Sequence, residues 1–272
     1  MKARLLVDDQ PLSFTDEGEG LPVLFQHGLG GDEAQVRAVF PDETPGIRRL
    51  TLECRGHGAS PHDPAGRYAI RRFAEDCLRL ADARRIGRFV AGGISMGAAI
   101  ALHLAQHHTD RVAALILARP AWLFAEAPDT MRAYAEVARH LRDAGPEGGR
   151  ALFEASDTAG LLAREAPGNL ASLRAFFGYP MPAQMARLLA RIAADGPGVS
   201  EAEAARLGQP TLVIGHGIDL AHPWHYAETL SRVIPGARLV EIPPKATDPA
   251  GHALAFRAAL HDFLTGLSAS SA

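Results

Sequence analysis

The chain has little lysine, little cysteine and no long apolar run. Lysine occurs only at Lys2 and Lys245, and the remaining positive charge comes from arginines that gather nowhere. With a net charge of -3 and no Lys/Arg-rich block, a nucleic acid is not an expected partner. No stretch of about 18 apolar residues occurs, so we expect no transmembrane helix and no membrane partner.

The two cysteines, Cys54 and Cys77, form no CxxC pair and are too few for a disulfide scaffold. Residues 1–10 lack the apolar core of a signal peptide. We therefore expect a reduced, cytoplasmic protein. The 272 residues are 47% hydrophobic and 22% charged, which fits an ordinary globular protein. This length allows one large α/β domain that carries an insertion.

Short apolar runs alternate with helical patterns in the first and last parts of the chain. The predicted strands are 21–26, 47–53, 88–92, 112–118, 210–215 and 238–242. Helices are predicted around Ile70, Phe73 and Cys77, which share a helical face, and at 98–106, 226–233 and 252–267. Strands that alternate with helices predict a mostly parallel sheet with helices on both faces.

The pattern changes between residues 120 and 209, where no strand is indicated. One helical face there carries Met131, Tyr134, Ala138 and Leu141, and Gly145-Pro146 is predicted to stop that helix. Another helix is predicted at 183–194. The sequence therefore predicts a helical insertion at 120–209 within an α/β core made of 1–119 and 210–272.

A G-x-S-x-G motif, Gly93-Ile94-Ser95-Met96-Gly97, lies between a predicted strand and a predicted helix. Such a turn holds a serine hydroxyl outward, and glycines flank it because side chains there would collide with neighbouring backbone. The start of the following helix supplies free N–H groups and a partial positive charge beside the hydroxyl. Ser95 is therefore the candidate nucleophile.

A second glycine-rich segment, His27-Gly28-Leu29-Gly30-Gly31, follows the strand predicted at 21–26. A tetrahedral acyl intermediate needs two N–H donors aimed at its oxygen. We expect one donor to be the backbone N–H of Met96, directly after Ser95. The other is expected from this loop, at the backbone N–H of Leu29.

The chain resembles the α/β-hydrolase superfamily. Residues 92–98 and the helix after them carry this resemblance, together with Arg55-Gly56-His57-Gly58-Ala59-Ser60. The likeness is to the lid-bearing, esterase and enol-lactonase-like branch of the superfamily. It covers 21–120 and 210–267, and it implies the α/β-hydrolase fold, with residues 120–209 as a variable helical lid. Cys54 is a departure, because an aspartate is common there, and we expect its role to be structural.

The resemblance implies a chain order of serine, acid and histidine. The base is then His252, on the loop after the last strand, and the acid is Asp219, after the preceding strand. Asp219 stands one residue further along than is most common, and Asp248 is the rival acid. A second location for the acid, after the strand at 112–118, holds Arg119 and is excluded.

His216, His222 and His225 form a local cluster near Asp219. Their spacing matches no common zinc pattern, so we expect no metal and no other cofactor. His27, in the glycine-rich loop, is expected to be structural.

The sequence thus predicts a serine hydrolase that cleaves a small apolar carboxylic ester or lactone through an acyl-enzyme. Aromatic residues of the insertion and its surroundings either line an apolar substrate pocket or form the core of the lid: Trp122, Phe124, Phe176, Phe177 and Trp224. Two alternatives stay open. One is other chemistry on the same fold, such as a perhydrolase (haloperoxidase-like), a carbon–carbon bond hydrolase or a lyase. The other is a non-catalytic protein that binds a ligand.

Overall fold

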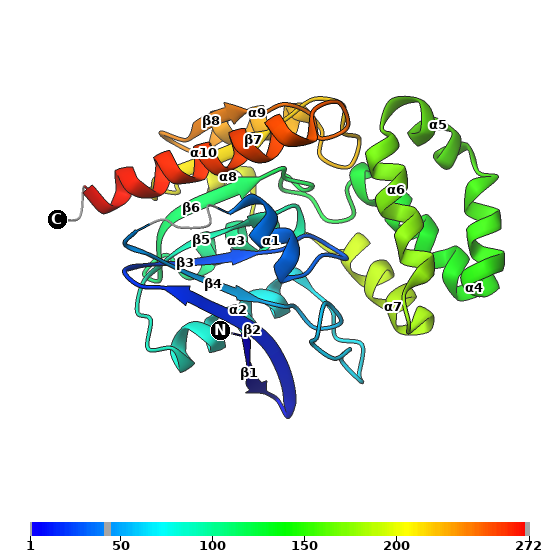
Figure 1. Cartoon of the computed structure of the whole chain (residues 1–272), viewed down its shortest axis with the longest axis horizontal. Helices are drawn as coiled ribbons and strands as arrows, with labels where there is room; N and C mark the ends of the chain where they lie inside the picture. The colour runs from blue at the N-terminus through cyan, green and yellow to red at the C-terminus, as the bar shows by residue number, and fades with distance from the viewer. Residues whose placement is uncertain (1, 41–44, 270–272) are drawn as a thin grey trace.

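An eight-stranded sheet forms the centre of the computed structural model, which describes residues 2–40 and 45–269 (Figure 1). The strand order is β1-β2-β4-β3-β5-β6-β7-β8. The strands from β4 to β8 in this order pair in parallel: β4 (Ile47–Leu52), β3 (Leu21–Gln26), β5 (Phe89–Ile94), β6 (Val112–Ala118), β7 (Thr211–Gly215) and β8 (Arg238–Glu241). These six strands confirm the predicted ones to within a few residues at each end.

An N-terminal hairpin of β1 (Lys2–Val7) and β2 (Gln10–Gly18), which is not among the predicted strands, extends one edge of the sheet. The two strands pair antiparallel, and β2 also pairs antiparallel with β4. Asp8 and Asp9 turn the chain with φ values of 46° and 63°. Positive φ at both central residues is the geometry of a two-residue hairpin turn that matches the twist of the strands.

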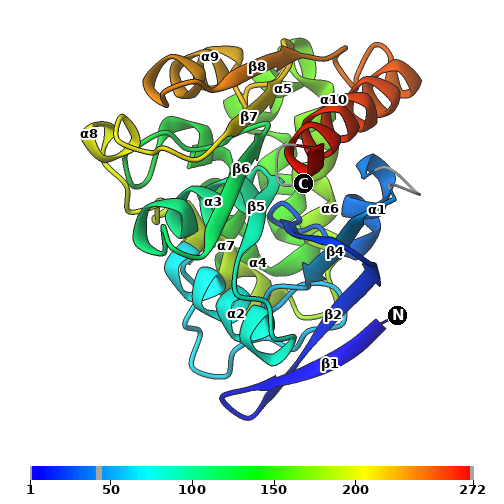
Figure 2. The ribbon, with the colours of Figure 1, turned by 90° about the vertical axis from the view of Figure 1, so that its left-hand side faces the viewer.

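Helices cover both faces of the sheet (Figure 2). One face carries α1 (Glu33–Val39) and α10 (Pro249–Ala269), and the other carries α2 (Ile70–Ala83), α3 (Met96–His107) and α9 (Trp224–Val233). Successive strand residues alternate between the two cores, as where Val23 and Phe25 face α1 and Leu24 faces the opposite side. Because both faces are buried, these strands read as continuous apolar runs. The predicted fold class is confirmed.

Between β6 and β7 the described chain contains helices and no strand. The main ones, which we call the cap, form a separate group beside the sheet in Figure 1: α4 (Arg132–Glu154), α5 (Asp157–Glu165), α6 (Pro167–Ala175) and α7 (Pro182–Ala193). Shorter turns of helix are η1 (Asp129–Met131), η2 (Phe176–Gly178) and α8 (Glu201–Ala204). The contacts between α4 and α7 bury the apolar face that the sequence predicted.

The predicted stop at Gly145-Pro146 is a kink within α4. Gly145 has φ 70° and ψ -171°, and the helix resumes and runs on to Glu154. Proline suits this place because its missing N–H is not needed in the first turn of the resumed helix.

A sharp turn joins β5 to α3 at Ser95, whose backbone has φ 56° and ψ -110°. The turn brings the chain back on itself so closely that side chains are excluded at the flanking positions. A Cβ on Gly93 would lie 2.6 Å from the Cα of Gly97, and a Cβ on Gly97 would lie 2.4 Å from the carbonyl oxygen of Gln26. The motif therefore needs glycine for steric reasons.

We predict that Gly97→Ala lowers the free energy of unfolding by about 1–3 kcal/mol, because the backbone of Gln26 must move away from the new methyl group. Gly208→Ala is the matched control, since a Cβ there would meet nothing within 4 Å. Urea denaturation of both variants measures the effect. Equal stability of the two variants would show that the turn is not under this steric constraint.

Candidate active site

Ser95 lies in a cavity of about 370 Å³, between the carboxyl ends of the central strands and the cap. Its Oγ is 2.8 Å from Nε2 of His222. On the other side of that ring, Nδ1 lies 2.9 Å from each carboxylate oxygen of Asp219. A serine, a histidine and a carboxylate are thus joined by hydrogen bonds in the order that activates a serine nucleophile.

The histidine against Ser95 is not the one that the sequence predicted. His252 lies in the first turns of α10, where its Nδ1 hydrogen-bonds to the Pro243 carbonyl at 2.9 Å. Its ring packs edge-on against His216, with the centroids 5.2 Å apart. In the described part of the chain no hydrogen bond joins it to Ser95 or Asp219. The structure corrects the prediction because the start of α10 turns this ring into the protein.

Asp248, the rival candidate for the acid, forms no hydrogen bond with Ser95 or His222 in the described part of the chain. Asp248 precedes α10, and its Oδ1 accepts a hydrogen bond from the N–H of Gly251 at 2.8 Å. A carboxylate at the beginning of a helix satisfies N–H groups that lack partners there. Of the two candidate acids, the structure brings Asp219 to the serine and histidine.

Asp219 is buried and surrounded by donors. Nη2 of Arg119 lies 2.6 Å from Oδ2, and Nδ2 of Asn169 lies 2.8 Å from Oδ1. The backbone N–H of His222 donates to Oδ1 at 3.0 Å. Burial alone would raise the pKa of this carboxyl, but His222 and Arg119 hold it well below its usual value. Asp219 is therefore ionised at neutral and at mildly acidic pH.

His222 is held in its neutral form. Burial lowers its pKa, the charge of Asp219 raises it, and the charge of Arg119 lowers it again. The net direction is downward. Because a carboxylate only accepts hydrogen bonds, Nδ1 carries the proton and Nε2 keeps a free electron pair toward Ser95. This is the tautomer that a general base requires.

The predicted oxyanion donors lie beside this group. Gly28 and Leu29 line the cavity, and Met96 is the first residue of α3. Among the described residues, the N–H groups of Leu29 and Met96 have no hydrogen-bond acceptor. Gln35 fixes the loop by accepting from the N–H of Gly28 at 2.7 Å. Free donors on a braced loop and at a helix start are suited to bind a developing negative charge.

The histidine of that loop has a structural place, as expected. Nε2 of His27 accepts the N–H of Cys54 at 3.0 Å, and Nδ1 bonds to the Gly28 carbonyl at 2.8 Å. Cys54 is fully buried, and burial raises the pKa of its thiol. The ring thus ties the loop to the end of β4.

The aromatic residues proposed for the substrate pocket lie elsewhere. None of Trp122, Phe124, Phe176, Phe177 and Trp224 lines the cavity that holds Ser95. Phe176 and Phe177 are buried in the core of the cap, and the Trp122 indole donates to the carbonyl of Asp195 at 2.8 Å. These rings bury the apolar face of the cap itself. Instead, polar and apolar side chains share the lining of this cavity. Gln35, Arg119, Asn169, Ser172 and Lys245 are among the polar ones, and Leu29, Ile94, Ala171 and Ile218 are among the apolar ones.

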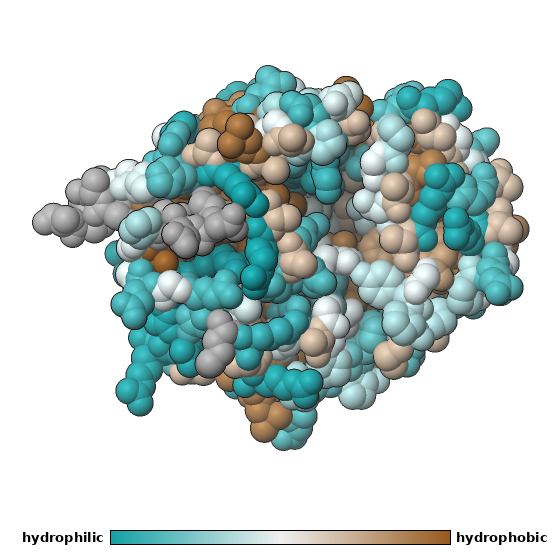
Figure 3. Space-filling model, viewed as in Figure 1, coloured by the Kyte–Doolittle hydropathy of each residue, from teal (hydrophilic) through white to brown (hydrophobic). Residues whose placement is uncertain are grey.

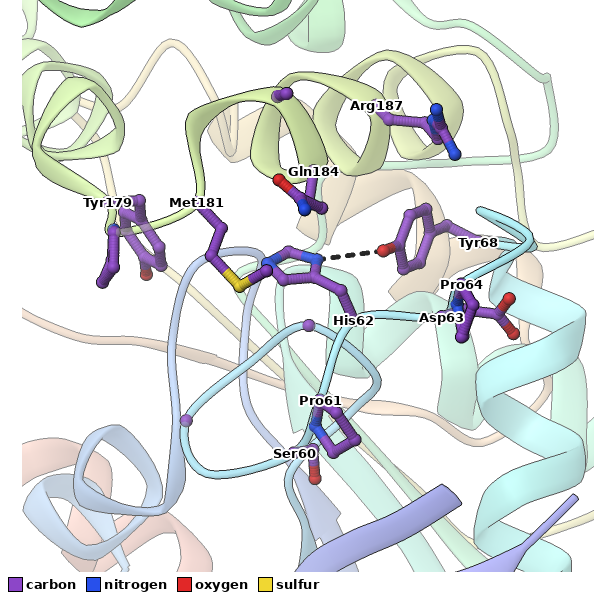
Figure 4. A pocket seen from close by; sticks show the side chains of 14 residues that line it. Ser60, Pro61, His62, Asp63, Pro64, Tyr68, Tyr179, Met181, Gln184 and Arg187 are labelled. Atoms are coloured by element: carbon purple, nitrogen blue, oxygen red, sulfur yellow. Dashed lines mark hydrogen bonds between the residues drawn. The ribbon is translucent and has the colours of Figure 1, made fainter. Parts of the chain in front are cut away.

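A larger cavity of about 690 Å³ lies between the loop after β4 and the start of α7 (Figure 4). It also contains a serine and a histidine, but these do not meet. The Ser60 hydroxyl donates to the Glu53 carbonyl and accepts the N–H of Ser13, while His62 bonds to the hydroxyl of Tyr68. Ser60 is thus engaged in holding strands together. The cavity around Ser95 is the candidate active site.

Sequence reasoning missed His222, Arg119 and Asn169 as partners of the acid. His222 stands only three residues after Asp219, so a local signal for this pair exists in the sequence. Arg119 stands where a second acid is absent, and only the fold shows that its charge meets Asp219. Asn169 lies in the cap, 50 residues from Asp219 in sequence, and nothing local indicates its contact.

Comparisons with known proteins identify a family of the same fold. The family model described as the alpha/beta hydrolase fold matches residues 22–254. RutD of Variovorax paradoxus, which its name gives provisionally as a carbamate hydrolase, is 30% identical, with 95% of this chain and 98% of that protein aligned. The described residues contain no helix that is long and apolar enough to cross a membrane.

Solved structures of similar proteins extend over nearly the whole chain. The enol-lactonase from Burkholderia xenovorans has 28% identity and a TM-score of 0.72, covering 96% of this chain and 99% of its own. A thermophilic esterase from Thermogutta terrifontis has 25% identity and a TM-score of 0.73, with 97% and 99% covered. The likeness therefore includes the cap as well as the sheet.

We predict that His252→Gln weakens the pH dependence of stability. Burial lowers the pKa of His252 to about 4, so unfolding lets this ring take up a proton at mildly acidic pH. The associated stability is present above about pH 6.5 and is lost as the pH falls toward 4. The free energy of unfolding, measured by urea titration at pH 7 and 4.5, should fall less in His252→Gln than in the wild type. The exposed His261 supplies the control, His261→Gln, and an identical fall in all three proteins would contradict the assignment.

Proposed function

The chain belongs to the α/β-hydrolase family, and we propose from this premise that it is a serine hydrolase with Ser95 as the nucleophile. The chain is a hydrolase by its family and relatives. The observation that carries the proposal is the 2.8 Å contact between Ser95 and His222, with Asp219 behind the ring. In this proposal His222 is the general base, in place of the His252 that the sequence predicted.

The reaction proceeds in two steps. His222 takes the proton of Ser95 as Oγ bonds to the carbonyl carbon, and the N–H groups of Leu29 and Met96 bind the resulting oxyanion. The leaving oxygen departs with the proton from His222, which leaves an acyl-enzyme. Water then gives a proton to His222 and attacks the acyl carbon, and Ser95 is restored when His222 returns that proton. Asp219 stabilises the imidazolium form throughout.

The proposed substrate is a small carboxylic ester or lactone with polar groups. A cavity of about 370 Å³ is at the small end for a ligand site, and amide, hydroxyl and cationic side chains line part of it. A pocket lined by the aromatic residues was one of the two roles that the sequence left open for them, and we base the proposed substrate on this mixed lining instead. The similarity to an enol-lactonase and an esterase supports acyl transfer from oxygen.

A carbamate is the second candidate, because RutD proteins align over nearly their full length and a carbamate carbonyl undergoes the same attack. A panel of small esters, lactones and carbamates separates the two by kcat/KM. Peracid formation or carbon–carbon bond cleavage without ester turnover would favour the other chemistries of the fold. Tight ligand binding without any turnover would favour a binding protein.

We predict that a fluorophosphonate probe labels Ser95, as located by peptide mass spectrometry, and that Ser95→Ala abolishes the labelling. Because His222 contacts Oγ, His222→Gln should slow labelling by at least about 1,000-fold. The matched control is His252→Gln, which should label at nearly the wild-type rate. The reverse order would restore His252 as the base, and failure to label Ser95 in the folded wild type would refute the serine mechanism.

Arg119 should set the pH range of activity. Its charge opposes protonation of His222, and the base works only when neutral, so Arg119→Met should raise the apparent pKa of the acid limb of kcat/KM by about one unit. Arg119→Lys keeps the charge and should shift it less. A pH–rate profile of the three proteins measures this, and coincident acid limbs would show that Arg119 does not act on the base.

A further inference from the structure

Asn169 of the cap forms hydrogen bonds with three groups of residues 219–222, which we call the acid loop. Its Nδ2 donates to Oδ1 of Asp219 at 2.8 Å, and its Oδ1 accepts the backbone N–H groups of Leu220 and Ala221 at 2.8 and 3.1 Å. This amide orientation is fixed by its partners, because the N–H groups only donate and the carboxylate only accepts. One side chain thus satisfies three groups between the acid and the base.

The position of these bonds matters because Asp219 and His222 belong to one short loop. Leu220 and Ala221 are the residues between them, so their backbone sets how the carboxylate and the imidazole face each other. Asn169 lies near the start of α6, on a different part of the chain. The other donors to the carboxylate, Arg119 and His222, lie on the sheet side.

We propose that Asn169 is a positioning residue that makes alignment of the base depend on docking of the cap. The proposal rests on the proposed function, in which His222 activates Ser95. With the cap docked, Asn169 holds the loop and His222 lies against Ser95. When α6 moves away, two backbone N–H groups and the carboxylate lose their partner, and the His222 ring is free to leave Ser95.

A second contact of the cap holds the glycine-rich loop at residues 27–31, which we call the oxyanion loop. The Tyr179 hydroxyl, just before α7, donates to the carbonyl of Gly30 at 2.6 Å. The Phe176 ring covers the same residue, since a Cβ on Gly30 would lie 2.5 Å from it. Gly30 follows Leu29, the proposed donor. The cap therefore holds both the acid loop and the oxyanion loop, and closure over a substrate assembles the site.

The charged and titratable groups around Asp219 and His222 come from several elements. They are Arg119 after β6, Tyr134 of α4, His216 after β7 and Lys245 after β8. Burial raises the pKa of Tyr134 to about 12, and burial lowers the pKa of His216, so both are neutral near pH 7. His252 packs edge-on against His216 and does not itself line the cavity. A new carboxylate at position 169 would thus act on His222 within an otherwise constant set of charges.

The test uses a pair of nearly isosteric variants in the full chain. Asn169→Leu removes every bond of the amide and should slow fluorophosphonate labelling of Ser95 by about 10–100-fold, the scale of a misplaced catalytic group. Asn169→Asp keeps acceptors for Leu220 and Ala221 but brings a second carboxylate to Asp219. It should retain more labelling and move the acid limb of the labelling rate up by about one pH unit.

Arg174→Gln is the matched control on the same helix. The Arg174 guanidinium pairs with Glu154 of α4 at 2.6 Å on the exposed surface of the cap, so its loss removes an ion pair within the cap and leaves the bonds of Asn169 to the acid loop in place. This variant should label like the wild type, and thermal unfolding of every variant shows whether it is folded.

Two results would overturn the proposal. One is wild-type labelling by folded Asn169→Leu, and the other is an equal loss in Arg174→Gln, which would indicate general loosening of the cap. If the wild type labels at Ser95 in either case, only the role of Asn169 fails. If Ser95 of the wild type does not label, the proposed function fails as well.

Discussion

The buried charge of Asp219 is the constraint around which this site is organised. An ionised carboxylate away from water is costly unless charges and hydrogen bonds surround it. Here the donors come from the end of β6, from its own loop and from the cap. Satisfying one carboxylate therefore requires that separate parts of the chain meet at one place. That place is also where the serine turn opens, so the same contacts that stabilise the charge fix the geometry of the base.

The parallel sheet makes this meeting possible. β5, β6 and β7 are neighbours, and parallel strands end at the same edge. Ser95, Arg119 and the loop that carries Asp219 each follow directly after one of these strands. In open α/β sheets ligands bind at this edge, because the loops there converge while the strands behind them stay rigid. The cap, on the right in Figures 1 and 3, lies against the same edge, which is why it contacts both of the proposed catalytic loops.

Local features of the site were predictable from the sequence, but contacts between segments that are distant in the sequence were not. The Ser95 turn follows from glycines whose steric need is local, and the central strands follow from apolar runs buried on both faces. In the sequence His252 and His222 each follow a predicted strand, and only the structure separates them, because it places His252 in α10 and packs its ring against His216. The aromatic residues of the insertion could either line a substrate pocket or form the core of the cap. In the structure Phe176 and Phe177 lie in the core of the cap. The contact of Asn169 depends on how two distant segments dock, which no local pattern encodes.

The arrangement has a mechanical consequence. When acid and base come from separate elements, each is held by its own packing. Asp219 and His222 instead share one loop that includes the half-exposed Leu220, so a change in that backbone moves them together. Leu220 and the preceding Ile218 are exposed, so their side chains do little to hold this backbone, and the loop depends in part on hydrogen bonds from outside. Arg119 supplies charge from the rigid sheet, whereas Asn169 supplies the backbone contacts from the cap. In the proposed site the core of the protein thus holds Asp219 in place, whereas alignment of His222 depends on the cap.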